Sequence, residues 1–122
     1  MNDSVCYVVA VLNWYVDLPD TPMRATVSDE WLARRLQGEG VELSLVETAL
    51  LLGSLRRLIR SKDAPALPPV RSLAYFRPVM EELRTHPVPD GYLDYLRLKL
   101  RHAAEQRGTS ANVQKKALSD DR

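Results

Sequence analysis

The sequence predicts an all-α fold: a single compact bundle of about five helices around a central apolar helix, residues 43–61. Three observations predict it. The stretch Val41–Arg60, VELSLVETALLLGSLRRLIR, is apolar around most of its circumference, which is typical of a helix buried from several sides. Apolar residues recur at helical spacing in four further segments, separated by proline- or glycine-rich links. A chain of 122 residues can bury one hydrophobic core, so we expect a helical domain over residues 1–107 and a disordered polar tail over residues 108–122.

The first predicted helix covers residues 4–17, with Asp3 or Ser4 as its N-cap. The valines of this segment also suit a strand, but the apolar pattern continues for more than a dozen residues, which favours the helix. Cys6 lies within the pattern and is predicted to be an inert thiol in the core. The apolar stripe consists of Val5, Val8, Val9, Leu12 and Val16.

The second predicted helix covers residues 28–37 and follows a proline-rich turn. Thr26 and Asp29 have the spacing of a capping box, in which each side chain bonds the other residue's backbone amide. We expect both tryptophans, Trp14 in the first helix and Trp31 in the second, to pack against the core. Glycines at positions 38 and 40 end the second helix.

The central helix is predicted to start with a second capping box, formed by Ser44 and Glu47. Three prolines in the following segment, KDAPALPPV, predict an extended connector. A fourth helix is expected over residues 72–85, and Pro78 should kink or break it because proline lacks an amide donor. Asp90 is the expected cap of the last helix, residues 90–106.

Cysteine content and hydropathy bear on the cellular compartment. The single cysteine, Cys6, excludes a disulfide within the chain and fits a reducing cytoplasm. The apolar run Val5–Leu12 is too short to span a bilayer, and Asp3 precedes it where a secretory signal would carry a basic residue. We therefore expect a cytoplasmic protein without a membrane partner.

Charge is distributed unevenly along the chain, although the net charge is only +1. Residues 1–55 have a balance of −5, whereas residues 56–122 have a balance of +6. A basic half suggests an anionic partner, most commonly nucleic acid. The alternative is that these cations interact with helix C-termini and with acidic neighbours such as Glu81 or Glu82. The candidate phosphate-binding residues are Arg56, Arg57, Arg60, Arg71, Arg97, Lys99 and Arg101.

The residue types narrow how nucleic acid could be bound. The N-terminal half of the central helix is apolar and acidic, which argues against reading bases in the major groove as a helix-turn-helix protein does. Tyr92 and Tyr95 could stack on the bases of a single strand, although tyrosines at this spacing more often pack at the edge of a core. Neither His86 nor His102 has neighbours at metal-ligand spacing, so we expect no metal and no cofactor. No nucleophile elbow or glycine-rich phosphate loop is present, and we expect no enzymatic activity.

Three segments resemble a group of small bacterial proteins associated with mobile elements and replication genes: LPDTPMR at residues 18–24, VETA at 46–49 and VRSLAYF at 70–76. The residue pattern over residues 38–84 is also similar to that of the C-terminal helical module of DnaD-type primosome proteins. That resemblance implies assembly and single-strand DNA binding, with Tyr75–Phe76 at the module's signature position. The chain lacks the module's usual terminal tryptophan, and its proline connector is longer.

These observations predict a non-enzymatic accessory module in replication or mobile-element maintenance. It would bind DNA or RNA phosphates electrostatically, with little sequence preference or a preference for single strands. The alternative is a protein–protein adaptor or small structural partner that docks or dimerises through an apolar surface. The apolar positions that favour this alternative are Tyr15, Leu50, Leu51 and Leu58.

Overall fold

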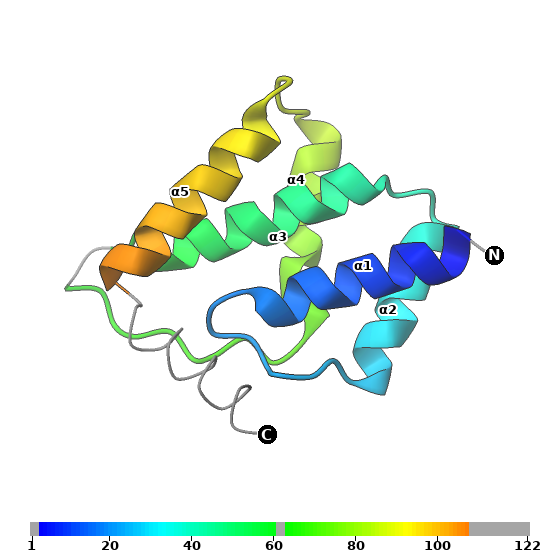
Figure 1. Cartoon of the computed structure of the whole chain (residues 1–122), viewed down its shortest axis with the longest axis horizontal. Helices are drawn as coiled ribbons and strands as arrows, with labels where there is room; N and C mark the ends of the chain where they lie inside the picture. The colour runs from blue at the N-terminus through cyan, green and yellow to red at the C-terminus, as the bar shows by residue number, and fades with distance from the viewer. Residues whose placement is uncertain (1–2, 61–62, 108–122) are drawn as a thin grey trace.

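The computed structural model describes residues 3–60 and 63–107, and every regular element in these ranges is a helix. The predicted all-α fold is therefore confirmed. In Figure 1, α3 runs between α1 and α5, while α2 packs on α1, and α4 packs on α3 from behind. The predicted tail over residues 108–122 lies outside the described ranges. The chain forms, in order, α1 (Asp3–Asp17), α2 (Val27–Gly38), α3 (Leu43–Leu58), the 3-10 helix η1 (Leu73–Phe76), α4 (Arg77–Thr85) and α5 (Tyr92–Arg107).

The central helix α3 contacts α1, α4, α5 and η1, as its nearly continuous apolar circumference predicts. It ends at Leu58, three residues before the predicted end. The predicted capping box at its start is wrong: Glu42 is the N-cap and makes no side-chain cap bond. The Ser44 carbonyl instead accepts a hydrogen bond from the Thr48 hydroxyl at 2.7 Å. The buried residues of α3 are Val46, Thr48, Ala49, Leu50, Leu52, Gly53, Ser54 and Leu55.

Helix α1 is confirmed as a helix, but it presents a different face to the core than its valines suggest. Val9 is 49% exposed, and Cys6 is exposed too, so the prediction of a core thiol is wrong. The reason is a contact distant in sequence, because the Tyr7 hydroxyl donates a hydrogen bond of 2.7 Å to the Val41 carbonyl and holds Tyr7 inward. The inner stripe consequently contains Tyr7, Val8, Val11 and Tyr15, and Leu18 is buried just after the helix ends.

The start of α2 is the capping box that the sequence predicts. The Thr26 hydroxyl accepts from the Asp29 amide, and Asp29 Oδ2 accepts from the Thr26 amide at 2.9 Å. Asp29 is only 1% exposed, and its second oxygen accepts from the Leu73 amide at 2.9 Å. One buried carboxylate therefore holds the start of α2 and the start of η1 together.

Pro78 divides the predicted fourth helix instead of kinking it. The 3-10 helix η1 ends at Phe76, and α4 begins at Arg77 with Pro78 in its first turn, where a missing amide breaks no helical hydrogen bond. Close packing fixes this segment against α3. A Cβ atom on Gly53 would lie 2.7 Å from the fully buried Phe76 ring, so glycine is needed for the two segments to approach.

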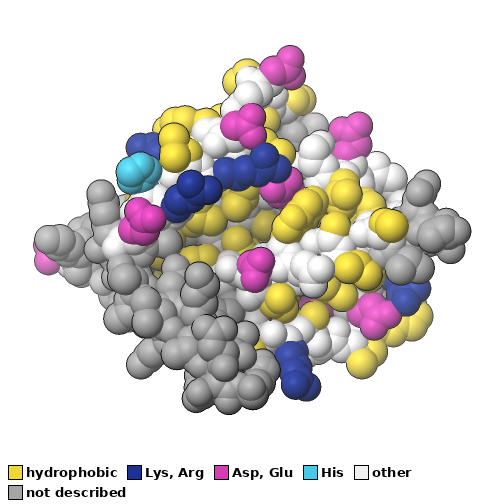
Figure 2. Space-filling view, viewed as in Figure 1, with side chains coloured by type: hydrophobic (Ala, Val, Ile, Leu, Met, Phe, Trp, Pro, Cys, Tyr) yellow, Lys and Arg dark blue, Asp and Glu magenta, His cyan; other side chains and the backbone are white. Residues whose placement is uncertain are grey.

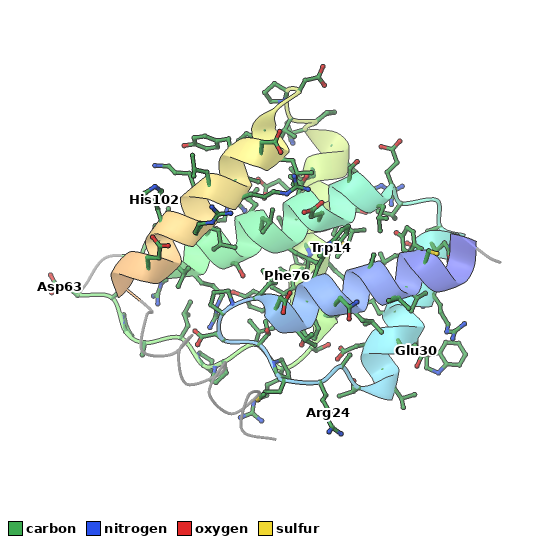
Figure 3. All side chains as sticks on the ribbon, viewed as in Figure 1. Trp14, Arg24, Glu30, Asp63, Phe76 and His102 are labelled. Carbon is green, nitrogen blue, oxygen red and sulfur yellow. The ribbon has the colours of Figure 1, made fainter. Side chains whose placement is uncertain are left out.

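Gly91 precedes α5 with a φ of 86°, a conformation that favours glycine, and the helix starts at Tyr92, two residues after the predicted start. Leu96 and Leu100 are buried on its inner face, where α5 packs on α3. Figure 3 shows that His102 projects from the outer side of α5. Helix α5 therefore exposes one face for functional residues.

Candidate nucleic-acid interface

Arg57, at the C-terminal end of α3, is a buried structural residue. Its side chain is only 7% exposed. It donates hydrogen bonds to the Pro68 carbonyl at 2.8 Å, to the Tyr75 hydroxyl at 3.2 Å and to Asp20 Oδ2 at 3.4 Å. Its guanidinium carbon also lies 5.3 Å from the centre of the Tyr75 ring. Arg57 thus ties α3 to the α1–α2 loop, the proline connector and η1.

Arg56 and Arg60 also bond to the protein itself. Arg56 makes a two-pronged ion pair with Glu82 of α4, at 2.9 and 2.7 Å. The hydrogen bond within this pair raises the pKa of Arg56 and lowers the pKa of Glu82. Arg60 donates to the Pro65 carbonyl at 2.6 Å. We call Arg56, Arg57 and Arg60, with these partners, the anchored end of α3.

Arg71 differs from these three arginines. It lies at the end of the connector and is exposed, with no hydrogen bond or ion pair within residues 3–60 and 63–107. The connector runs beside the α1–α2 loop, where the Val70 amide bonds the Asp20 carbonyl at 2.9 Å. Because η1 follows and Tyr75 contacts Arg57, Arg71 comes near the end of α3.

The basic residues of α5 fall into two kinds. Arg97 makes a two-pronged ion pair with Glu47 of α3 at 2.9–3.0 Å and also bonds Asp94. The Glu47 hydrogen bond raises the pKa of Arg97. Lys99 and Arg101 are exposed, and no carboxylate in the described part of the chain pairs with them. Arg97 therefore fastens α5 to α3, whereas Lys99 and Arg101 present their charges to solvent.

Two tyrosines extend this exposed surface. The rings of Tyr92 and Tyr95 are stacked, with centroids 5.8 Å apart and planes inclined by 27°. The Lys99 ammonium lies 5.9 Å from the centre of the Tyr95 ring, and Tyr95 is 52% exposed. Figure 2 shows basic side chains and a histidine gathered over α5. We call Tyr95, Lys99, Arg101 and His102 the open face of α5.

Other features of the described residues give no second candidate site of this kind. Within them, no three His, Cys, Asp or Glu side chains are grouped to hold a metal ion. None of the helices in these ranges is long and apolar enough to cross a membrane. A pocket of about 340 Å³ lies between the start of α3, the end of α4 and the link to α5, with Glu42, Asp90, Ser44 and Thr48 among its lining residues.

The exposed apolar surface is not where the sequence suggested. Tyr15 and Leu50 are buried, and Leu51 and Leu58 are partly buried against the core. Trp31, predicted to be buried, is 70% exposed, whereas Trp14 packs against the core as expected. The spacing of Val27 and Trp31 could have indicated an outer stripe, because Ala33 and Leu36 already supply an inner face for α2.

Comparison with known proteins finds no matching family model, curated protein or solved structure. The resemblance to DnaD-type proteins therefore stays a prediction.

Proposed function

We propose that this protein is a non-enzymatic accessory module that binds nucleic acid through the open face of α5. The observation that carries the proposal is the Tyr92–Tyr95 stack with Lys99 against the exposed Tyr95 ring. Proteins that bind single strands combine aromatic side chains, on which bases stack, with cations that follow the phosphates. Tyr95 would stack on a base, while Lys99 and Arg101 would contact phosphates.

This proposal retains only some of the seven basic residues that the sequence suggests as phosphate-binding. A guanidinium that already bonds a carboxylate or a carbonyl must lose that bond before it can contact a phosphate. Arg56, Arg57, Arg60 and Arg97 are in that position. Arg71 and Arg101 need no such exchange, and Lys99 gives up only its contact with the Tyr95 ring, so we assign phosphate contacts to these three residues.

The biological context follows from the resemblance stated above. Similarity to DnaD-type modules implies single-strand DNA binding during replication, and the bacterial group it also resembles implies maintenance of a mobile element. Both contexts, with the lone cysteine, fit a cytoplasmic protein. The open face has no asparagine or glutamine, the residues that read adenine with a paired donor and acceptor, and its two cations are assigned to phosphates, so sequence preference should be low.

Fluorescence anisotropy with labelled single- and double-stranded oligonucleotides over a salt series tests this proposal. Affinity for the single strand should be higher and should fall steeply with salt. Tyr95→Ala should weaken binding about tenfold, because stacking contributes about 1–3 kcal/mol per base. The double variant Lys99→Ala, Arg101→Ala should weaken binding and reduce the slope with salt.

The matched control is Arg24→Ala, Arg84→Ala, which removes the same charge from exposed positions outside α5. Figure 3 shows Arg24 projecting outward from the α1–α2 loop. Equal losses in the two double variants would mean that only net charge matters and would contradict a site on α5. Absence of binding at low salt, about 50 mM, would contradict the proposal as a whole.

The adaptor alternative is favoured by a separate observation, the exposure of Val27 and Trp31 on α2. A large exposed apolar patch is typical of a surface that contacts another protein. An adaptor would show no salt-dependent affinity for oligonucleotides, so the same titration separates the two candidate functions.

A further inference from the structure

The outer face of α2 carries two large apolar side chains in contact with solvent. Val27 is 72% exposed and Trp31 is 70% exposed. They are four residues apart, so they lie on one stripe of the helix. Gly38 continues this stripe, and no atom lies within 4 Å of where its Cβ would be. Tryptophan is one of the residues enriched among those that dominate binding energy at protein interfaces.

A charged pair flanks this stripe. Arg34 forms an ion pair with Glu30 at 2.6 Å, and their side chains are 61% and 44% exposed. Along the helix the acidic residue comes first and the basic residue second. A neighbouring helix that runs antiparallel presents the same pair in reverse order, so each acid then faces a base. This flank is therefore electrostatically complementary to a copy of itself.

We propose that the outer face of α2 binds a second copy of this chain, with the two α2 helices antiparallel about a two-fold axis near residue 32. Such a contact is isologous, so the same patch serves both copies. Glu30 of each copy faces Arg34 of the other. The two Trp31 side chains lie on either side of the axis, about 3 Å apart along the helix direction. Val27 reaches the other copy's α2 near Gly38, where the missing side chain leaves space.

The size of the patch sets the strength of the dimer. A helix of 12 residues is about 18 Å long, so a contact made mainly by α2 is at the small end of specific interfaces. The dimer is therefore weak and reversible, with a dissociation constant between about 1 µM and 1 mM. The four facing charges contribute more to the choice of partner than to its affinity.

Sedimentation equilibrium of the full chain over about 1 µM to 1 mM tests the dimer. The dimer fraction should rise with concentration, and Trp31→Ser should raise the dissociation constant at least roughly tenfold. The matched control is Leu98→Ser, which removes an apolar side chain of 53% exposure from α5 and should leave association unchanged. A chain that stays monomeric throughout, or equal effects of the two substitutions, would overturn the proposal.

A charge exchange tests the symmetry. Glu30→Arg places two arginines on each flank, and Arg34→Glu places two glutamates there, so each variant alone should associate less than the wild type. An equimolar mixture of the two variants should restore dimerisation, because the flanks are then oppositely charged. Circular dichroism checks that both variants keep their helices. A mixture that associates no better than its components would overturn the two-fold arrangement.

Discussion

Two regions of this protein carry the same residue types for different purposes. At the anchored end of α3, Arg57 is buried among a carbonyl, a carboxylate and a tyrosine ring, and Arg56 pairs with Glu82. On the open face of α5, Lys99 lies against the exposed Tyr95 ring, and Arg101 is exposed on the same helix. The first set holds segments together, whereas the second set remains accessible to a ligand.

A count of basic residues therefore does not locate a binding surface. Both clusters contribute to the same excess of positive charge in the second half of the sequence. What separates them is whether the fold brings an acceptor to each cation. The following substitutions should therefore affect stability in one region and oligonucleotide binding in the other.

The largest effect is expected from Arg57→Ala. The change leaves the Pro68 carbonyl and Asp20 without this donor and removes the contact with the Tyr75 ring. Because hydrogen bonds to charged groups contribute about 1.5–3 kcal/mol, we expect the free energy of unfolding to fall by about 2 kcal/mol. Urea denaturation measures this fall. Arg101→Ala is the control and should leave stability unchanged. An equal loss in both variants would contradict the structural role of Arg57.

Gly53→Ala should be the next most damaging change, through packing at the same end of the molecule. The new methyl group would lie 2.7 Å from the Phe76 ring, which is fully buried and has little room to move. Overpacking destabilises the fold by about 1–3 kcal/mol, whereas the higher helix propensity of alanine stabilises it by up to about 1 kcal/mol. We expect a net loss of about 1 kcal/mol by urea denaturation. Gly38→Ala, whose Cβ meets nothing within 4 Å, should show no loss.

Tyr15→Phe should change the alkaline limit of stability. Burial raises the pKa of Tyr15 to about 12, with a smaller contribution from Asp29, whereas a tyrosine in the unfolded chain ionises near pH 10. The stability that this difference contributes is present below pH 10 and is lost as the pH rises toward 12, by up to about 1.4 kcal/mol per pH unit. The phenylalanine variant should therefore lose stability less steeply between pH 10 and 12.

At neutral pH the same variant should be at least as stable as the wild type. The Tyr15 hydroxyl is buried and has no hydrogen-bond partner among the described residues, so removing it breaks no bond. A clear loss of stability at pH 7 would show that this hydroxyl has a partner.

The smallest effect is expected from Arg56→Ala, because Arg56 and Glu82 are each nearly half exposed to solvent. Arg56 lowers the pKa of Glu82, so the pair stabilises the fold at pH values above about 4.5 and less as the pH falls below it. The difference between wild type and variant in thermal denaturation should be small at pH 7, and it should disappear in acid. Oligonucleotide affinity should not change. A marked loss of affinity would show that Arg56 belongs to the binding surface.

Local signals in the sequence predicted much of the fold. The capping box at Thr26 and the break at Pro78 depend on residues that are close in sequence, and the structure contains both. The orientation of α1 could not be predicted in the same way. Its valines offer several apolar faces of similar quality, and the choice between them depends on Tyr7 reaching Val41, a partner 34 residues away.

The candidate site, too, could be predicted from the sequence only in part. The sequence could indicate that Arg56 has an acidic neighbour on the next helix, and Glu82 is that neighbour. It could not indicate that Arg57 is buried, because two of its partners, Asp20 and the Pro68 carbonyl, come from loops whose paths depend on the whole fold. Trp31 was misassigned for a related reason: a tryptophan in a short helix is expected to face the core, and only the packing of α1 and η1 shows that it does not.

The Asp29 carboxylate has a consequence for how the molecule opens. Its two oxygens bond the amides of Thr26 and Leu73, which belong to segments more than 40 residues apart. If the start of η1 detaches, the carboxylate loses a partner and the first turn of α2 is weakened with it. The Thr26 and Leu73 amide protons are therefore expected to exchange with solvent through one shared opening event, which would make these segments a single cooperative unit.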